Sequence, residues 1–338
     1  MSPPNAASTP DAGRPPGFSD AGSVAELAAQ VALSVPEVKN SKAIAGLLPF
    51  LLTPQPEVEE LPGMFLPAGT RGEVDDAALL EIAVGGKIQY AQVRWLDELA
   101  DSVERSMDPP GSVHRLSEAL AREARSHFAA ALRSSGKEAA FFSSLSDLNA
   151  RYAASLALDG AYRNTTSARL SFEDYVEHAK ARAAPLRAPL DALLVLVDSA
   201  EEVTRGARSC FEFAAAAKQL GDDTLDLEED FRDRQLSWVV SETLRHLGNP
   251  DPPPEADEFY EAALLGGFID RNLAAAEELY WEALALAVGR FPGCVPFLEN
   301  ETQETRAMKY DMAQIVASSG DAASRSDPAA SSERKGSL

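Results

Sequence analysis

Aspartates at helical spacing are the side chains of this sequence best suited to bind a metal ion. Asp222, Asp226 and Asp230 lie at positions i, i+4 and i+8 of the segment 219–234, QLGDDTLDLEEDFRDR. On a helix their carboxylates would share one face, where like charges repel unless a cation lies between them. Carboxylate oxygens are ligands that Mg²⁺ prefers. The segment therefore predicts a magnesium site.

A second acidic pair lies nearer the N-terminus. In the segment 90–102, YAQVRWLDELADS, Asp97 and Asp101 are one helical turn apart. Because Mg²⁺ keeps several waters and takes only one or two carboxylates from the protein, a cluster of ions needs ligands from two walls. We therefore expect the two acidic faces to oppose each other across one cavity. The alternative is that both faces are only solvated, since 53 of the 338 residues are Asp or Glu.

Both segments carry further residues in a recognisable order. The first has Tyr90-Ala91, Arg94, Asp97-Glu98 and Asp101, and the second has Gln219-Leu220, Asp226, Glu229-Asp230, Arg232 and Arg234. In these residues the chain resembles the squalene and phytoene synthase family, whose motifs read approximately YAxxRxxDDxxD and QLxNxxRDxxEDxRRGR. Two positions depart from the pattern: Asp222 replaces Asn, which keeps an oxygen ligand, and Leu225 replaces Arg, which removes a cation. A weaker likeness covers residues 170–184 and 273–292.

This resemblance implies a fold and a reaction. The fold would be all-α, a class I terpenoid-synthase-like antiparallel helical bundle around a central cavity. The protein would be a Mg²⁺-dependent prenyltransferase or terpene synthase of isoprenoid biosynthesis. It would ionise a prenyl diphosphate with loss of diphosphate. The reaction would be a head-to-head condensation, as in squalene and phytoene synthases. The catalytic residues and Mg²⁺ ligands so predicted are Asp97, Asp101, Asp222, Asp226 and Asp230.

Cations near the acidic segments are candidates for binding the diphosphate. Arg94 lies one turn before the first pair, and Arg232 and Arg234 lie just after the second cluster. A guanidinium group presents a fork of donors that matches phosphate oxygens. The alternative is that each arginine only pairs with neighbouring carboxylates.

Aromatic and small side chains are candidates for the pocket wall. Phe211 and Ala215 directly precede the second acidic segment, and Tyr175 lies in the weaker matching stretch. Aromatic faces stabilise carbocations, and small side chains leave room for an isoprenoid tail. We predict that all three line the substrate pocket. The alternative is that they belong to the hydrophobic core.

Other functions stay open beside head-to-head condensation. A class I terpene cyclase acting on one prenyl diphosphate has the same i, i+4, i+8 spacing in its second metal motif. A non-enzymatic helical binding protein would need no metal. The segment Gly85-Gly86-Lys87 resembles the diphosphate-binding segment of chain-elongating prenyl transferases, but it lies only ten residues before Asp97. We interpret it as a turn or helix break, which argues against head-to-tail elongation.

Composition and charge exclude several classes of protein. The net charge of −22 argues against nucleic-acid binding and against a polybasic membrane anchor. The two cysteines, Cys210 and Cys294, are too few for a disulfide framework, so we expect a cytoplasmic protein. No apolar stretch is long enough to cross a membrane. Membrane contact is expected only transiently, for release of a lipid product.

Proline, glycine and apolar periodicity divide the chain into elements. We predict a disordered leader over residues 1–23, a single all-α isoprenoid-synthase-like domain over 24–316 and a disordered tail over 317–338. Within the domain, helices are expected over 25–35, 43–52, 75–106, 112–134, 139–158, 171–184, 189–204, 205–247, 255–265 and 268–288. The segment 205–247 is long enough for one extended helix or two bent ones.

Overall fold

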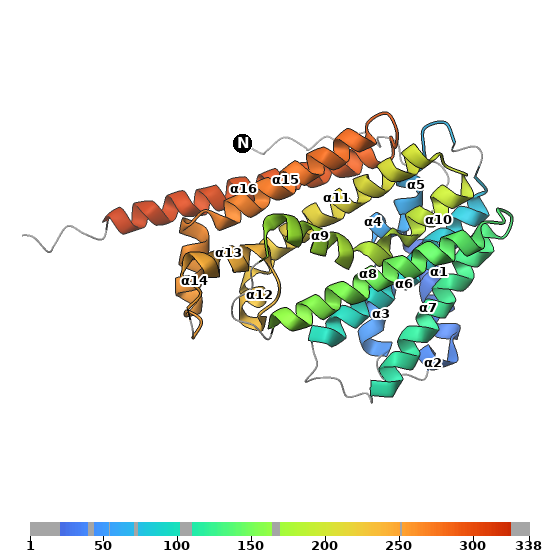
Figure 1. Ribbon diagram of the computed structural model, residues 1–338, viewed down its shortest axis with the longest axis horizontal. Helices are drawn as coiled ribbons and strands as arrows, with labels where there is room; N and C mark the ends of the chain where they lie inside the picture. Colours follow the sequence, from blue (N-terminus) through green and yellow to red (C-terminus); the bar gives the residue numbers. More distant parts are fainter. Residues whose placement is uncertain are drawn as a thin grey trace, which may run out of the picture. The chain divides into compact units, whose positions relative to one another are not determined.

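The computed structural model describes residues 21–39, 44–53, 55–70, 74–101, 110–163, 170–250 and 252–325. Over these ranges the chain forms helices and turns, and it contains no strand (Figure 1). This confirms the all-α prediction. Residues 1–20 of the predicted leader and 326–338 of the predicted tail lie outside the described residues.

The chain divides into two compact units. The first contains Met1–Leu145 and Pro185–Thr204, and the second contains Ser146–Ala184 and Arg205–Leu338. The predicted single domain over residues 24–316 therefore stays a prediction.

The first unit is organised around helix α6 (Asp76–Asp101). Several residues of α6 are fully buried, among them Ile82, Ala83 and Ile88. Because apolar residues on more than one face of a helix must all be covered, α6 has neighbours on several sides. Those neighbours are α1 (Ala21–Ser34), α3 (Ile44–Leu52), α4 (Pro56–Glu59), α5 (Leu61–Met64), α7 (Pro110–Leu132) and α10 (Ala188–Leu196), while α2 (Pro36–Lys39) packs on α1 and α7.

Two glycines allow close approach of helices to α6. A Cβ atom at Gly86 would lie 2.4 Å from Cγ of Pro189 in α10, and one at Gly85 would lie 3.1 Å from the carbonyl oxygen of Ala124 in α7. Both glycines are inside α6, so our interpretation of this segment as a turn or helix break was wrong. Glycine is present here because the packing leaves no room for a side chain.

Lys87, which follows these glycines, is completely buried and paired. Its Nζ lies 3.0 Å from Oε1 of Glu59 and donates a hydrogen bond of 2.6 Å to the carbonyl oxygen of Thr53. A buried ammonium group is tolerated only with such partners. Lys87 is therefore part of the interior of the first unit.

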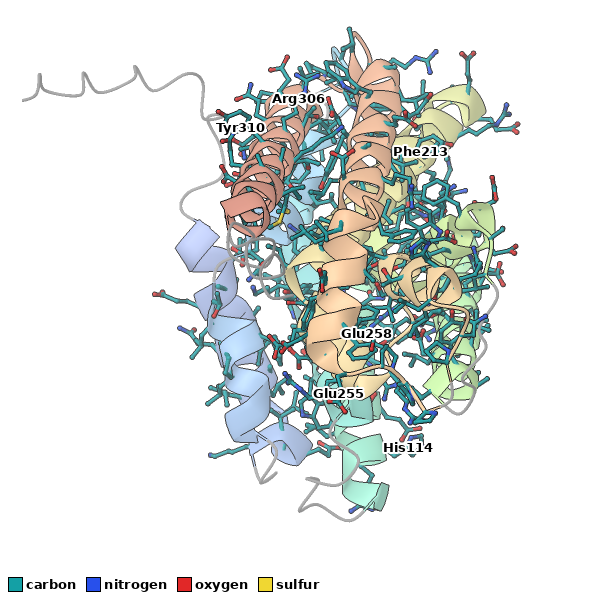
Figure 2. The ribbon with its side chains drawn as sticks, turned by 90° about the vertical axis from the view of Figure 1, so that its left-hand side faces the viewer. His114, Phe213, Glu255, Glu258, Arg306 and Tyr310 are labelled. Carbon is teal, nitrogen blue, oxygen red and sulfur yellow. The ribbon has the colours of Figure 1, made fainter. Side chains whose placement is uncertain are left out.

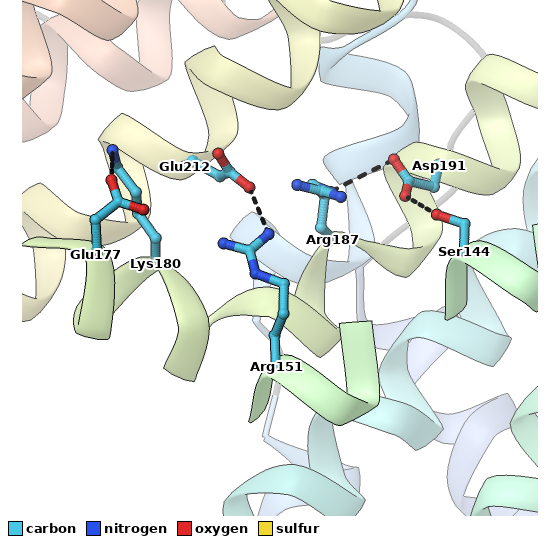
Figure 3. Close-up of polar contacts among 7 residues, drawn as sticks. All are labelled: Ser144, Arg151, Glu177, Lys180, Arg187, Asp191 and Glu212. Carbon is cyan, nitrogen blue, oxygen red and sulfur yellow. Dashed lines mark hydrogen bonds and ion pairs between the residues drawn. The ribbon is translucent and has the colours of Figure 1, made fainter. Parts of the chain in front are cut away.

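Helix α10 ends earlier than the sequence indicated. We predicted one helix over residues 189–204, but α10 stops at Leu196 and a short turn contains Asp198 with φ of 49°. A left-handed residue interrupts the helical hydrogen bonds. Within α10, buried Asp191 accepts a hydrogen bond of 3.0 Å from Ser144 and lies 3.5 Å from Arg187 (Figure 3).

The second unit contains eight helices within the described residues. They are α8 (Glu138–Arg163) and α11 (Glu201–Leu225), which both begin in the ranges of the first unit, then α9 (Phe172–Arg182), α12 (Leu227–Asp233), α13 (Trp238–His246), α14 (Ala256–Leu265), α15 (Phe268–Ala287) and α16 (Cys294–Arg325). Ser171 caps α9, because its Oγ accepts a hydrogen bond of 3.1 Å from the backbone N–H of Asp174.

The helix α16 was not predicted. It is 32 residues long and continues to Arg325, into the stretch that we predicted as a disordered tail from residue 317. Alanine favours helix and the next proline is Pro328, so nothing in the sequence ends the helix before that point. Helix α16 packs on α15, where Arg306 donates to Glu277 and lies over the ring of Trp281 (Figure 2).

Both cysteines are buried in the second unit. Cys210 of α11 is 0% exposed and donates a hydrogen bond of 3.3 Å to the carbonyl oxygen of Ala283 in α15. Cys294 begins α16 and is 2% exposed. Burial raises the pKa of the Cys210 thiol to about 12 and that of Cys294 further.

Candidate functional site

The second acidic segment bends at its central aspartate. Helix α11 ends at Leu225, and Asp226 is the N-terminal cap of α12 with φ of −96° and ψ of 12°. Helical hydrogen bonds still cross the bend, from the N–H of Asp226 to the oxygen of Asp222 and from the N–H of Asp230 to the oxygen of Asp226, both at 2.8 Å. Asp222 and Asp230 thus belong to two consecutive helices. The segment 205–247, predicted as one extended helix or two bent ones, instead contains most of α11, then α12 and α13.

A buried asparagine fixes the end of α11. Asn272 of α15 is 0% exposed, and its Nδ2 donates hydrogen bonds to the carbonyl oxygen of Leu220 at 2.5 Å and to Oγ1 of Thr224 at 2.9 Å. These bonds hold the C-terminal part of α11 against α15. The bend at Asp226 therefore starts from an anchored turn.

Four aspartates, which we call the acid cluster, gather around this bend: Asp222, Asp223, Asp226 and Asp230. Asp222 and Asp226 are exposed, and Asp230 is half-buried. Asp223 is 2% exposed. Its carboxylate accepts a short hydrogen bond from the hydroxyl of Tyr175 in α9 and one of 2.9 Å from Nε2 of Gln219.

Burial and mutual repulsion change the protonation of this cluster. Burial is the main cause that raises the pKa of Asp223 to about 7, and the charge of Asp222 adds to it. Burial also raises the pKa of Asp230 to about 8, and the charges of Asp223 and Asp226 add to it. Burial therefore favours the protonated forms of Asp223 and Asp230, and the neighbouring carboxylates add to this effect.

Arg182 is a cation near the cluster that sequence reasoning missed. It is the last residue of α9, and its charge lowers the pKa of both Asp223 and Asp230. Its Nε also lies 3.9 Å from Oδ2 of Asp159 in α8, a residue paired at 2.8 Å with His178. The available signal was its place seven residues after Tyr175 in a stretch that matched the family pattern.

The predicted wall residues occupy different surroundings. Tyr175 is 1% exposed and holds Asp223, whereas Phe211 and Ala215 of α11 are half-buried. Glu212, which follows Phe211 on α11, accepts a hydrogen bond of 3.0 Å from Arg151 of α8 (Figure 3). Phe213, labelled in Figure 2, lies under the ammonium group of Lys180 at 4.8 Å. The role of Phe211, Ala215 and Tyr175 as pocket lining stays a prediction.

Arg232 and Arg234 follow the cluster on the exposed side of α12. Arg232 is paired with Glu228 at 2.6 Å. Both arginines line a pocket of about 230 Å³ together with Phe231, Tyr162 and other residues, none of which is an aspartate of the acid cluster. Their predicted binding of diphosphate stays a prediction.

The first acidic segment lies at the C-terminal end of α6, in the first unit. Asp97 is half-buried and Arg94 is exposed, while Trp95 between them is 2% exposed. Asp101 is the last residue of the helix, and its side chain is outside the described residues. The helix is continuous through Asp97 and Asp101, which places the two residues one turn apart as predicted.

The acid cluster suits a hard divalent cation in its chemistry. All its donors are carboxylate oxygens, and the pKa values of Asp223 and Asp230 are raised mainly by burial, although the charge of Arg182 lowers them. Among the described residues no three metal-binding side chains already converge on one point. A bound cation would have to draw these carboxylates together, and those of Asp222 and Asp226 are exposed to solvent.

Comparison with proteins of known structure identifies the fold. No family model and no curated protein matches this sequence. Heptaprenyl diphosphate synthase from Staphylococcus aureus matches in structure with a TM-score of 0.65 and 13% identity, over 84% of this chain and 98% of that chain. Geranylgeranyl pyrophosphate synthetase from Pyrococcus horikoshii matches with a TM-score of 0.62 and 15% identity, over 83% and 97%.

A third structure contains a ligand and a metal. Geranylgeranyl pyrophosphate synthase from Corynebacterium glutamicum, in complex with isoprenyl diphosphate and magnesium, matches with a TM-score of 0.58 and 15% identity, over 87% of this chain and 99% of that chain. The chain has the all-helical isoprenoid synthase fold, which confirms the predicted fold class. Within the described residues no helix is both long and apolar enough to span a bilayer.

Proposed function

We propose that this protein is a divalent-metal-dependent prenyltransferase that elongates a prenyl diphosphate. The observation that carries the proposal is the acid cluster: four carboxylates with one nearby guanidinium group, at a bend between two helices of an isoprenoid synthase fold. Elongation is favoured over head-to-head condensation because the structures with this fold are polyprenyl and geranylgeranyl diphosphate synthases. Our argument against elongation also depended on a turn at Gly85-Gly86-Lys87, which is helical.

Asp222, Asp226 and Asp230, with Asp97 and Asp101 of the other segment, are the proposed metal ligands. A bound Mg²⁺ would supply the positive charge that stabilises diphosphate as it leaves the prenyl carbon. Metal binding at the second segment would also keep Asp230 ionised at neutral pH, against the effect of burial.

The cations and the apolar wall have separate tasks in this proposal. Arg182 donates hydrogen bonds to the phosphate oxygens from a position set by its pairing with Asp159. Arg94 remains a further candidate for this role, whereas Arg232 and Arg234 line a different pocket, so their binding of the substrate diphosphate stays a prediction. Tyr175 keeps Asp223 oriented through its hydroxyl, and Phe211 and Ala215 lie beside the isoprenoid tail.

The test is to incubate the full chain and Mg²⁺ with geranyl, farnesyl or geranylgeranyl diphosphate, with and without isopentenyl diphosphate. We expect pyrophosphate release that requires isopentenyl diphosphate and yields a longer prenyl diphosphate. A hydrocarbon with twice the carbons of the substrate would instead support head-to-head condensation, and a cyclic product of the same carbon number would support a cyclase. No release under any condition would leave the helical binding protein as the answer.

A further inference from the structure

A pocket of about 230 Å³ in the second unit has a lining unlike that of the acid cluster. It lies between the end of α8, the helices α12 and α13 and the loop after α13. Its apolar residues include Phe231, Val240 and Leu244, and its polar residues include Tyr162, Arg234 and Asn249. Pockets with an apolar wall and a few converging polar groups are the usual form of small-molecule sites.

Positive charge gathers at this pocket although the whole chain has a net charge of −22. Arg232 and Arg234 line it directly. Arg163 donates a hydrogen bond of 3.5 Å to Gln235, a third lining residue. Arg245 is close enough to act on the pKa of Tyr162, which it lowers against the larger effect of burial.

Only some of this charge is balanced nearby. Arg232 pairs with Glu228, and Arg245 pairs with Glu242. Arg234 has no ion-pair partner in the part of the chain that the structure describes. Its guanidinium group is thus available to an anion that enters the pocket.

Two residues with hydroxyl groups, Tyr162 and Ser241, line the same pocket as Arg234. The hydroxyl of Tyr162 and that of Ser241 are 2.5 Å apart, and Ser241 in turn donates a hydrogen bond of 2.8 Å to the carbonyl oxygen of Ser237. Because the single hydrogen of the Ser241 hydroxyl is used in this bond, the Tyr162 hydroxyl is the donor to Ser241. A phosphate in the pocket would offer it an alternative acceptor.

The backbone supplies an independent observation. Arg234 and Asn249, both in the pocket lining, have φ of 53° and 51°. Asparagine tolerates the left-handed region, but arginine adopts it at a cost that glycine would avoid. At Arg234 this conformation ends α12, where its backbone N–H donates to the carbonyl oxygen of Asp230 and so fixes where the side chain starts.

We propose that this pocket is a second anion site, separate from the acid cluster, for a small phosphate ester with an aromatic or short aliphatic group. Arg234 binds the phosphate through its fork of donors, with Arg232 and the Tyr162 hydroxyl alongside. Phe231 and Leu244 contact the organic part. The pocket volume fits a small ligand and not a long prenyl chain. The site does not depend on the reaction proposed above.

The experiment is calorimetric titration of the full chain with phenyl phosphate, in the absence of Mg²⁺. We expect binding that is stronger than that of inorganic phosphate or benzyl alcohol, because both parts of the probe are contacted. Arg234→Gln should weaken it about tenfold. Arg133→Gln, a change at an exposed arginine of the first unit, is the matched control and should leave it unchanged. Absence of binding to the unmodified chain, or equal binding by Arg234→Gln, overturns the proposal.

Two further variants separate binding from folding and from the acid cluster. Arg234→Gly removes the guanidinium group and relieves the positive φ, so the melting temperature should stay equal or rise while binding falls about tenfold. Asp226→Asn should bind phenyl phosphate as the unmodified chain does. If Asp226→Asn loses binding, or if binding needs Mg²⁺, the pocket is part of the acid cluster and the proposal is wrong.

Discussion

Two acidic segments with the same four-residue spacing have different backbones. Asp97 and Asp101 lie on α6, which is continuous to its last residue. Asp222 and Asp230 lie on either side of a bend at Asp226. Spacing predicts a shared face only while the helix continues. A bend after an anchored turn therefore changes which carboxylates are exposed and which are covered.

Burial changes the protonation of carboxylates in the second segment. In the second unit one aspartate is buried against Tyr175 and Gln219, and another is half-buried, so their pKa values rise to about 7 and about 8. Tyr175 and Arg182 of α9, a helix distant in sequence from the aspartates, both lower the pKa of Asp223 against the larger effect of burial. The pKa values of these carboxyl groups are therefore set by tertiary neighbours and not by the acidic motif alone.

The largest expected effect tests whether both segments serve one reaction. Asp97→Asn and Asp226→Asn should each reduce Mg²⁺-dependent pyrophosphate release by at least about a thousandfold, because each removes a proposed metal ligand. Exposed Asp257 of α14 provides the matched control, and Asp257→Asn should keep full activity. A steady-state assay of pyrophosphate release measures all three. If only Asp226→Asn is inactive, the second segment acts without the first.

The next effect concerns the cation of the second unit. Arg182→Gln should lower kcat/KM on the order of a hundredfold, since it removes a preorganised donor to the leaving diphosphate. Arg182→Lys keeps the charge and loses the fork, so it should recover only part of this loss. Unchanged kcat/KM in Arg182→Gln would mean that the guanidinium group serves only the pairing with Asp159.

A smaller effect appears in stability against pH. Because the folded-state pKa values of Asp223 and Asp230 lie above the ordinary value of 3.8, the folded protein holds protons that the unfolded chain has released. The free energy of unfolding should therefore be highest below about pH 4 as far as these groups are concerned, and fall as the pH rises to about 8. Asp223→Asn should flatten this fall, by roughly 1–3 kcal/mol at pH 8.

Urea unfolding of the full chain at several pH values measures this difference. Asp257→Asn should give a curve parallel to that of the unmodified protein. Mg²⁺ with pyrophosphate should restore stability at pH 8, because a bound cation favours the ionised cluster. Parallel curves for Asp223→Asn and the unmodified chain would show that this carboxyl is ionised throughout.

The smallest effect compares glycines in the two helices that carry the acidic segments. Gly86→Ala in α6 should destabilise the protein by about 1–3 kcal/mol, because the new Cβ would meet Pro189 at 2.4 Å. Gly221→Ala in α11 should stabilise it by about 0.5–1 kcal/mol, since nothing lies within 4 Å of a Cβ there. Thermal unfolding distinguishes the two signs, and equal effects would contradict the different packing of the helices.

Local signals in the sequence predicted much of this fold. Apolar periodicity and the prolines and glycines between the apolar segments predicted the all-α fold class and most of the helices. The exceptions have physical causes: Pro110, expected to end a helix, is the first residue of α7, where its missing N–H costs nothing. The split near Asp198 depends on a single left-handed residue that no residue type signalled.

The candidate site was less accessible to prediction. The acidic spacing indicated Asp222, Asp226 and Asp230, but it did not single out Asp223, the most buried carboxyl of the acid cluster. Asp223 lies against Tyr175 of α9, and Arg182 is the last residue of the same helix. Both depend on how α9 packs on α11, which spacing along one segment does not contain.

The buried thiols give the molecule an internal reporter of its own motion. Only a thiolate reacts with a disulfide reagent, and burial both covers Cys210 and Cys294 and disfavours their ionised forms. Modification must then wait for a transient opening of α11 or α16. Because the chain has no other cysteine, the reaction rate of the unmodified protein counts openings of the second unit alone. A ligand that closes the acid cluster should lengthen that waiting time.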